Sequence, residues 1–152
     1  MYKKNVTNRV IFHHSLSKDV SATIINNWHI ERGFDCIGYH YVVRADGGIE
    51  IGRDIKMVGA HAFGKNKDSI GVCITGNFNK HNPTDNQYYA AAYIYLYLCG
   101  IYKKRLKIDF HRTGFEPCPG YKFNRGKLKK LIREFSGEKT WFGDMVNVIK
   151  QF

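Results

Sequence analysis

Acidic residues are scarce in this sequence. Only 13 Asp and Glu stand against 24 Lys and Arg, which gives a formal net charge of +11 at pH 7. A field of that sign attracts polyanions, which include nucleic acids, acidic membrane surfaces and the anionic polymers of bacterial envelopes. The charge alone does not choose among these three classes of partner.

Cysteine is also scarce, and the four residues show no CxxC spacing. A chain of 152 residues can bury enough core to fold without disulfides. We therefore expect Cys36, Cys73 and Cys99 to be free thiols that are mostly buried. Only Cys118 lies in a local sequence that suggests a chemical role.

Long apolar runs, repeats and linkers are missing as well. The N-terminus is basic but has no apolar segment of signal-peptide length before the first expected strand, which predicts a protein made and folded in the cytoplasm. The most apolar stretch, residues 88–102, is too short and too rich in tyrosine to span a bilayer. We expect one domain over residues 1–152, with its core at about 9–136.

Short apolar runs rich in β-branched and aromatic residues alternate with longer helical patterns. Strands are expected at residues 10–12, 38–43, 49–51, 69–75 and 106–110. Helices are expected from Ser21 to Gly33, from the capping pair Thr84 and Gln87 through residue 98, and from Asn124 to Gly137. This order predicts an α/β fold, a single domain with a mixed central β-sheet flanked by helices.

The C-terminal residues 137–152 have apolar side chains at helical spacing, which predicts a last amphipathic helix. In a basic protein such a helix could bind a membrane or a cell wall. The simpler interpretation, which we favour, is that its apolar stripe packs on the domain.

A possible metal site begins with residues 108–120. His111 ends an apolar run there, and Cys118 follows seven positions later in a turn held by two prolines and a glycine. Imidazole and thiolate can converge on zinc, although single His and Cys residues are more often core or surface residues. His14, at the end of the first strand, would add a third ligand. Three protein ligands leave zinc a position for water, as in catalytic sites.

Zinc in such a site makes its bound water more acidic and polarises a carbonyl group, so the implied chemistry is hydrolysis of an amide or an ester. The tetrahedral transition state then needs a proton donor or an oxyanion stabiliser. The hydroxyl of Tyr39, at the start of a strand, is a suitable group.

Five motifs in order carry a family resemblance. They are His13-His14-Ser15, Gly38-Tyr39-His40, Gly59-Ala60-His61-Ala62, residues 66–72 (Asn-Lys-Asp-Ser-Ile-Gly-Val), and His111-Arg112 through Cys118-Pro119-Gly120. From about residue 9 to 135 the sequence resembles the zinc-dependent N-acetylmuramoyl-L-alanine amidases. It is most similar to the compact phage lysozymes of that group, which share a fold with peptidoglycan recognition proteins.

The resemblance implies cleavage of the amide between N-acetylmuramic acid and the L-alanine of the stem peptide in peptidoglycan. By position it implies His14, His111 and Cys118 as zinc ligands and Tyr39 as the catalytic tyrosine. His13 is one residue early, and strand alternation is expected to point it to the other face. The loop that lines the substrate groove is expected to present His61 and Asn66.

The sequence departs from the family at one place. The family usually has one more position between His111 and Cys118, and a Lys or Thr stands two residues before the cysteine, where this chain has Glu116. Glu116 can act as the general base, as glutamate does in other zinc peptidases. Alternatively that role falls to Tyr39 and the metal, and Glu116 hydrogen-bonds a ligand histidine.

The function expected from this resemblance is that of a phage or prophage endolysin, a monomer whose positive charge draws it to the anionic cell envelope after release. A cytosolic amidase that recycles muropeptides usually has an aspartate as third ligand, so Cys118 argues against it. A non-catalytic peptidoglycan-binding module typically lacks the cysteine or the tyrosine. Nucleic acid as the main ligand is suggested only by the charge and by basic residues among Tyr and Phe at 102–110 and 121–133.

Overall fold

The computed structural model describes residue 3 and the ranges 6–112 and 117–137. Glu116 and all but the first residue of the helix expected at 137–152 lie outside the described residues. Predictions about their roles therefore stay predictions.

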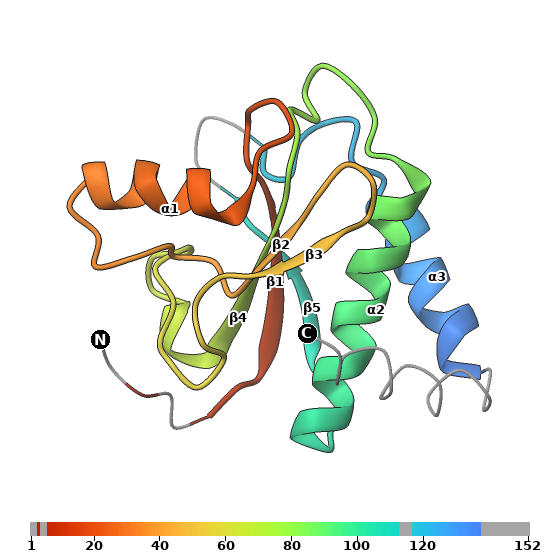
Figure 1. Ribbon diagram of the computed structural model, residues 1–152. Coiled ribbons are helices and arrows are strands. Elements are labelled where there is room, and N and C mark those ends of the chain that lie inside the picture. Colours follow the sequence, from red (N-terminus) through yellow and green to blue (C-terminus); the bar gives the residue numbers. More distant parts are fainter. Residues whose placement is uncertain (1–2, 4–5, 113–116, 138–152) are drawn as a thin grey trace.

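Five strands form one mixed sheet (Figure 1). Their order across the sheet is β3-β2-β4-β1-β5. Strands β1, β2, β4 and β5 are parallel, and β3 runs antiparallel to β2. The strands are β1 (Arg9–His14), β2 (Tyr41–Val43), β3 (Ile49–Ile51), β4 (Ser69–Ile74) and β5 (Lys107–Phe110). Because β1 and β4 lie in the middle with both faces covered, their sequences are apolar nearly throughout.

Helices cover both faces of this sheet, as the sequence predicts (Figure 1). Helix α1 (Ala22–Glu31) lies on one face, and helices α2 (Asp85–Tyr102) and α3 (Arg125–Gly137) lie on the other. A 3-10 turn, η1 (Asn66–Asp68), precedes β4. Within the described part of the chain, no helix has the length and apolar content needed to cross a membrane.

The expected helix starts are confirmed. Ser21 accepts a hydrogen bond from the Ile24 N–H, and Thr84 and Gln87 form the complete capping box. Asn124 accepts from the Lys127 N–H at the start of α3. Each cap satisfies a backbone donor that has no partner inside its helix.

The two faces of the sheet bury separate cores. Val10 and Phe12 of β1 join the larger core under α2 and α3. Val42 and Cys73 belong to a smaller core under α1. Because successive side chains of a strand alternate between faces, this assignment also decides on which face each histidine of β1 lies.

Asp19 connects the loops at the carboxyl edge of the sheet, where the candidate site lies. Its carboxylate accepts hydrogen bonds from the Arg44 guanidinium, the Thr75 hydroxyl and the Ala45 N–H. The hydrogen bond from Arg44 is the main cause that lowers the pKa of Asp19 to about 2. The loops after β1, β2 and β4 thereby share one ionised group.

We expect Asp19→Asn to lower the free energy of unfolding near neutral pH by about 1 kcal/mol, after allowance for solvent screening of this partly exposed pair. Because the folded pKa lies below the usual value of 3.8, the stabilisation is complete above that value and is lost as the pH falls through about 2.

Urea unfolding at neutral pH and near pH 2 measures this difference. Glu134→Gln is the control, because it removes the carboxylate of an exposed ion pair with Lys130. This variant should change the free energy of unfolding little at either pH. An Asp19→Asn effect that is equally large at both pH values would contradict the ionic explanation.

Candidate metal centre

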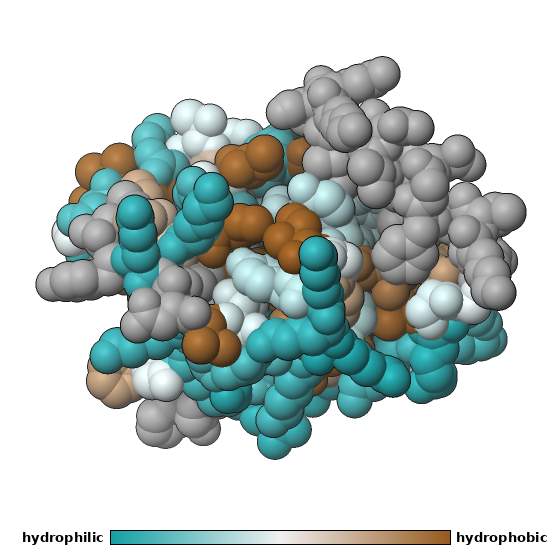
Figure 2. All heavy atoms as spheres, turned by 90° about the horizontal axis from the view of Figure 1, so that it is seen from below, coloured by the Kyte–Doolittle hydropathy of each residue, from teal (hydrophilic) through white to brown (hydrophobic). Residues whose placement is uncertain are grey.

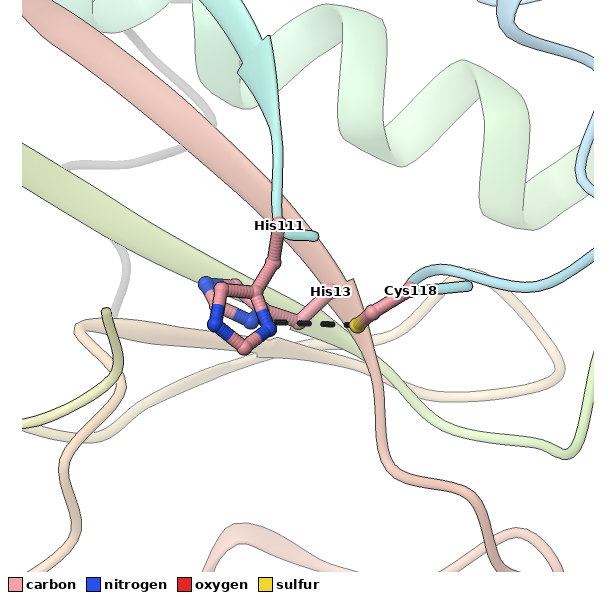
Figure 3. Close-up of side chains that lie close together, drawn as sticks. All are labelled: His13, His111 and Cys118. Atoms are coloured by element: carbon pink, nitrogen blue, oxygen red, sulfur yellow. Dashed lines mark hydrogen bonds between the residues drawn. The ribbon is translucent and has the colours of Figure 1, made fainter. Parts of the chain in front are cut away.

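Three potential metal ligands converge at the carboxyl edge of the sheet, as Figure 3 shows. His13, His111 and Cys118 each offer one ligand atom, and these atoms all lie within 4.8 Å of one another. The centroids of the two imidazole rings are 4.6 Å apart, and Cys118 Sγ lies 3.9 Å from His13 Nδ1. His13 and Cys118 are buried, and His111 is half-buried.

The strand register brings the two histidines together. Strands β1 and β5 are parallel neighbours, and Phe12 pairs with Phe110. Both phenylalanines point into the larger core, with ring centroids 6.0 Å apart. The next residue of each segment, His13 and His111, therefore lies on the opposite face beside the other. Cys118 comes from the loop that follows β5, after a bridge between Arg112 and Pro117.

The prediction that His14 joins this group, and that His13 points away from it, is wrong. His14 Nδ1 accepts a hydrogen bond of 3.2 Å from the Phe78 N–H, and its ring packs 5.9 Å from the Phe78 ring. Phe78 belongs to the core under α2 and α3. Strand alternation does separate the two histidines, but it places His13 with His111 and Cys118.

Tyr39 lies beside the group, as expected from the sequence. Its ring centroid is 5.1 Å from that of His13. Burial raises the pKa of Tyr39 well above its ordinary value, so the hydroxyl keeps its proton near neutral pH. Tyr39 also lines a groove of about 400 Å³ together with Ser15, Leu16, Trp28 and Arg32. Tyr39 thus lies beside both the candidate ligands and an open groove, and its hydroxyl is a potential proton donor.

His61, which the sequence predicts to contact substrate, lies beside His13 in the structure. This side chain is buried, and both ring nitrogens have partners inside the protein: Nδ1 lies 3.0 Å from His13 Nε2, and Nε2 lies 3.3 Å from Ser69 Oγ. Asn66 Oδ1 accepts hydrogen bonds from the N–H groups of His61 and Ala62, which shapes this loop. A contact of Asn66 with substrate stays a prediction.

Burial keeps the ligand groups uncharged when no cation is bound. It lowers the pKa of His13 well below its ordinary value, and the neighbouring His61 and His111 lower it further. It lowers the pKa of His111 as well. Burial raises the pKa of Cys118 to about 11, against the opposing effects of a hydrogen bond with the His14 backbone and the charge of Arg125. Neutral imidazoles have the lone pair that a metal ligand needs, and a cation bound here would displace the thiol proton.

Two imidazoles and one thiol form a donor set that suits a borderline-soft cation such as zinc. Three protein donors also leave a tetrahedral ion one position for a water or a substrate oxygen. The residues present therefore fit the metal that the sequence predicts.

This chain is similar to amidases, endolysins and peptidoglycan recognition proteins. The family model for N-acetylmuramoyl-L-alanine amidase (Amidase_2) matches residues 3–121. An endolysin of Enterobacteria phage K11 is 35% identical over 131 residues, which cover 81% of this chain and 87% of the endolysin.

Solved structures agree with these sequence matches. The endolysin N-acetylmuramoyl-L-alanine amidase LysCS from Clostridium intestinale has a TM-score of 0.78 and 29% identity, covering 88% of this chain and 89% of LysCS. Drosophila PGRP-LB has a TM-score of 0.67 and 27% identity, covering 91% of this chain and 85% of PGRP-LB. The family match extends over most of the chain, and it includes the segments that supply His13, His111 and Cys118. This chain belongs to the N-acetylmuramoyl-L-alanine amidase family.

Proposed function

We propose that this protein is a zinc-dependent N-acetylmuramoyl-L-alanine amidase that acts as a phage or prophage endolysin. The observation that carries the proposal is the convergence of His13, His111 and Cys118 beside Tyr39 in a chain of this family. A module that only binds peptidoglycan does not need this combination of a three-donor group and a partly buried tyrosine beside it. The substrate bond is the amide between N-acetylmuramic acid and the L-alanine of the stem peptide.

Five residues have defined parts in this proposal. His13, His111 and Cys118 would hold zinc, which supplies Lewis acidity at the scissile carbonyl and makes a water more acidic. The protonated hydroxyl of Tyr39 donates a hydrogen bond to the carbonyl oxygen, where negative charge develops in the tetrahedral transition state. Glu116 is the candidate base for the proton that water loses, because it precedes Cys118 by two positions.

The groove that Tyr39 lines is the proposed binding place of the peptidoglycan strand. It runs along the loop after β1 and the side of α1. Ser15 and Ser17 offer hydroxyls, Trp28 offers an apolar surface, and Arg32 offers a positive charge. These groups suit a substrate that combines sugar hydroxyls with a peptide that carries carboxylates.

The surface suits a protein that meets an anionic envelope after release from the host cytoplasm. The net charge is +11. Figure 2, which views the molecule from below, shows hydrophilic residues along much of the described surface, with apolar residues exposed among them. Long-range attraction of this kind raises the rate of encounter with a negatively charged polymer. The protein is proposed to act as a monomer.

Digestion of purified murein tests the proposal. Amidase cleavage creates new L-alanine amino termini and no new reducing sugar ends. We expect new L-alanine amino termini and no new reducing sugar ends. A zinc chelator should abolish the release of these amino termini, and added zinc should restore it. New reducing ends, or full amino-terminus release in the presence of the chelator, would overturn the proposal.

A further inference from the structure

A chain of buried hydrogen-bonding groups extends from His13 away from Cys118. His13 Nε2 lies 3.0 Å from His61 Nδ1. The other ring nitrogen of His61, Nε2, lies 3.3 Å from Ser69 Oγ, and Ser69 Oγ donates to the Lys65 carbonyl oxygen at 2.6 Å. His61 is 8% exposed and Ser69 is fully buried. This series of hydrogen bonds therefore connects His13, a proposed ligand, to the Lys65 carbonyl oxygen through buried side chains alone.

The Lys65 carbonyl oxygen, at the end of this series of hydrogen bonds, determines which nitrogen of each imidazole carries the proton. Ser69 has one hydroxyl proton, and the Lys65 carbonyl accepts it. Ser69 Oγ can then only accept from His61, so the ring proton of neutral His61 lies on Nε2. His61 Nδ1 is consequently unprotonated, and His13 donates to it from Nε2. Neutral His13 is left with an unprotonated Nδ1, the nitrogen that lies 3.9 Å from Cys118 Sγ.

Two glycines make room for the His61 ring. A Cβ on Gly71 would lie 2.5 Å from the ring, and a Cβ on Gly59 would lie 2.6 Å from it. Such distances exclude any larger residue unless the ring moves. Asn66 also fixes the backbone at His61, because its Oδ1 accepts a hydrogen bond from the His61 N–H. The position of this imidazole is thus set by the surrounding backbone.

A second buried histidine packs against the same ring. His40 meets His61 edge to face, with centroids 5.7 Å apart. His40 Nδ1 accepts from the Gly71 N–H, so its proton lies on Nε2, which faces the Met57 carbonyl oxygen at 3.0 Å. His40 is therefore held in one tautomer by backbone groups and does not compete with His13 for His61.

We propose that His61 is a positioning residue that holds His13 in the tautomer whose unprotonated Nδ1 faces Cys118 and His111. In zinc sites, the partner that accepts the second ring N–H of a ligand histidine fixes the tautomer and orientation of that ligand. Here a neutral histidine takes the place that a carboxylate or a carbonyl oxygen usually has. The proposal rests on the proposed function, because it requires that the three-residue group binds zinc.

Two substitutions of His61 separate positioning from packing. His61→Asn retains an acceptor oxygen close to the position of Nδ1, whereas His61→Leu fills similar space without an acceptor. We expect His61→Leu to weaken zinc binding by about 10- to 100-fold. His61→Asn should remain within about 3-fold of the wild type, because the acceptor for His13 Nε2–H is kept. Competition with a chromogenic chelator measures the affinity, and circular dichroism confirms that each metal-free variant is folded.

Nitrogen NMR of the wild-type imidazole groups gives a second measurement that does not depend on variants. We expect protons on Nε2 of both His13 and His61, and a scalar coupling across the N–H···N hydrogen bond between the two rings. A proton on His13 Nδ1, or zinc affinity in folded His61→Leu equal to that of the wild type, would overturn the proposal. So would an affinity of His61→Asn as low as that of His61→Leu.

The two proposals fail in different ways. If wild-type protein binds no zinc, the proposed function fails together with this inference. If the wild type binds zinc and releases L-alanine amino termini while His61→Leu retains full affinity, only the role of His61 is wrong.

Discussion

Replacing His13 by alanine is expected to abolish stoichiometric zinc binding and to lower murein hydrolysis by about 10³-fold or more, because the metal supplies several kcal/mol of transition-state stabilisation. Only Cys118 and His111 of the converging group would remain. Zinc content measured by mass spectrometry, together with the rate of release of L-alanine amino termini, checks this result.

His14→Ala is the matched control because the two histidines are neighbours on opposite faces of β1. We expect this variant to bind zinc fully, and to lose about 1–3 kcal/mol of stability because the Phe78 N–H loses its buried acceptor. Zinc loss in His14→Ala with zinc retained in His13→Ala would show that the residue expected from the sequence, and not the one found in the structure, is the ligand.

Tyr39→Phe is expected to keep bound zinc and to lower kcat by about 10²- to 10³-fold, the usual cost of losing one oxyanion donor. The ring still packs 5.1 Å from His13, so only the hydroxyl is removed. Because the lost hydrogen bond acts mainly in the transition state, KM should change little. Steady-state kinetics on soluble muropeptides and a zinc determination on the same sample measure both quantities.

Tyr89→Phe makes the same chemical change on α2, on the opposite face of the sheet, where Tyr89 is partly exposed. This variant should retain wild-type kcat. Unchanged kcat in Tyr39→Phe would remove Tyr39 from the mechanism, and loss of zinc from it would instead indicate a structural role.

The fold follows from the sequence to a large extent, because its determinants are local. Apolar runs at 10–12 and 69–75 predict the buried central strands, and Ser21, Thr84 and Asn124 mark the helix starts that the structure confirms. The boundaries differ by a few residues. For example, a strand is expected at 38–43, but only Tyr41–Val43 pair with β4 in the sheet.

The sequence predicts two of the three residues that converge in the structure, His111 and Cys118. Strand alternation separates His13 from His14, but the sequence favours His14 on the face of His111, whereas the structure has His13 there. The signal that would have decided it is in the sequence: Phe12 and Phe110 are large apolar residues in neighbouring strands, and each is followed directly by a histidine. Equivalent core residues in parallel register put the residues that follow them on a common face.

The role of His61 was not predictable in this way. His61 and His13 are 48 positions apart, and their contact depends on a loop shaped by Asn66 and on the space left by Gly59 and Gly71. No periodic pattern in a sequence predicts a buried hydrogen bond between two imidazoles. Only the packed structure shows that this histidine faces a proposed ligand.

Zinc K-edge X-ray absorption of the purified wild-type protein tests the central claim most directly. If His13, His111 and Cys118 hold the metal, the spectrum should contain one sulfur at about 2.3 Å and two imidazole nitrogens at about 2.0–2.1 Å. A zinc environment without sulfur, or with imidazole scattering that persists unchanged in His13→Ala, would contradict the site.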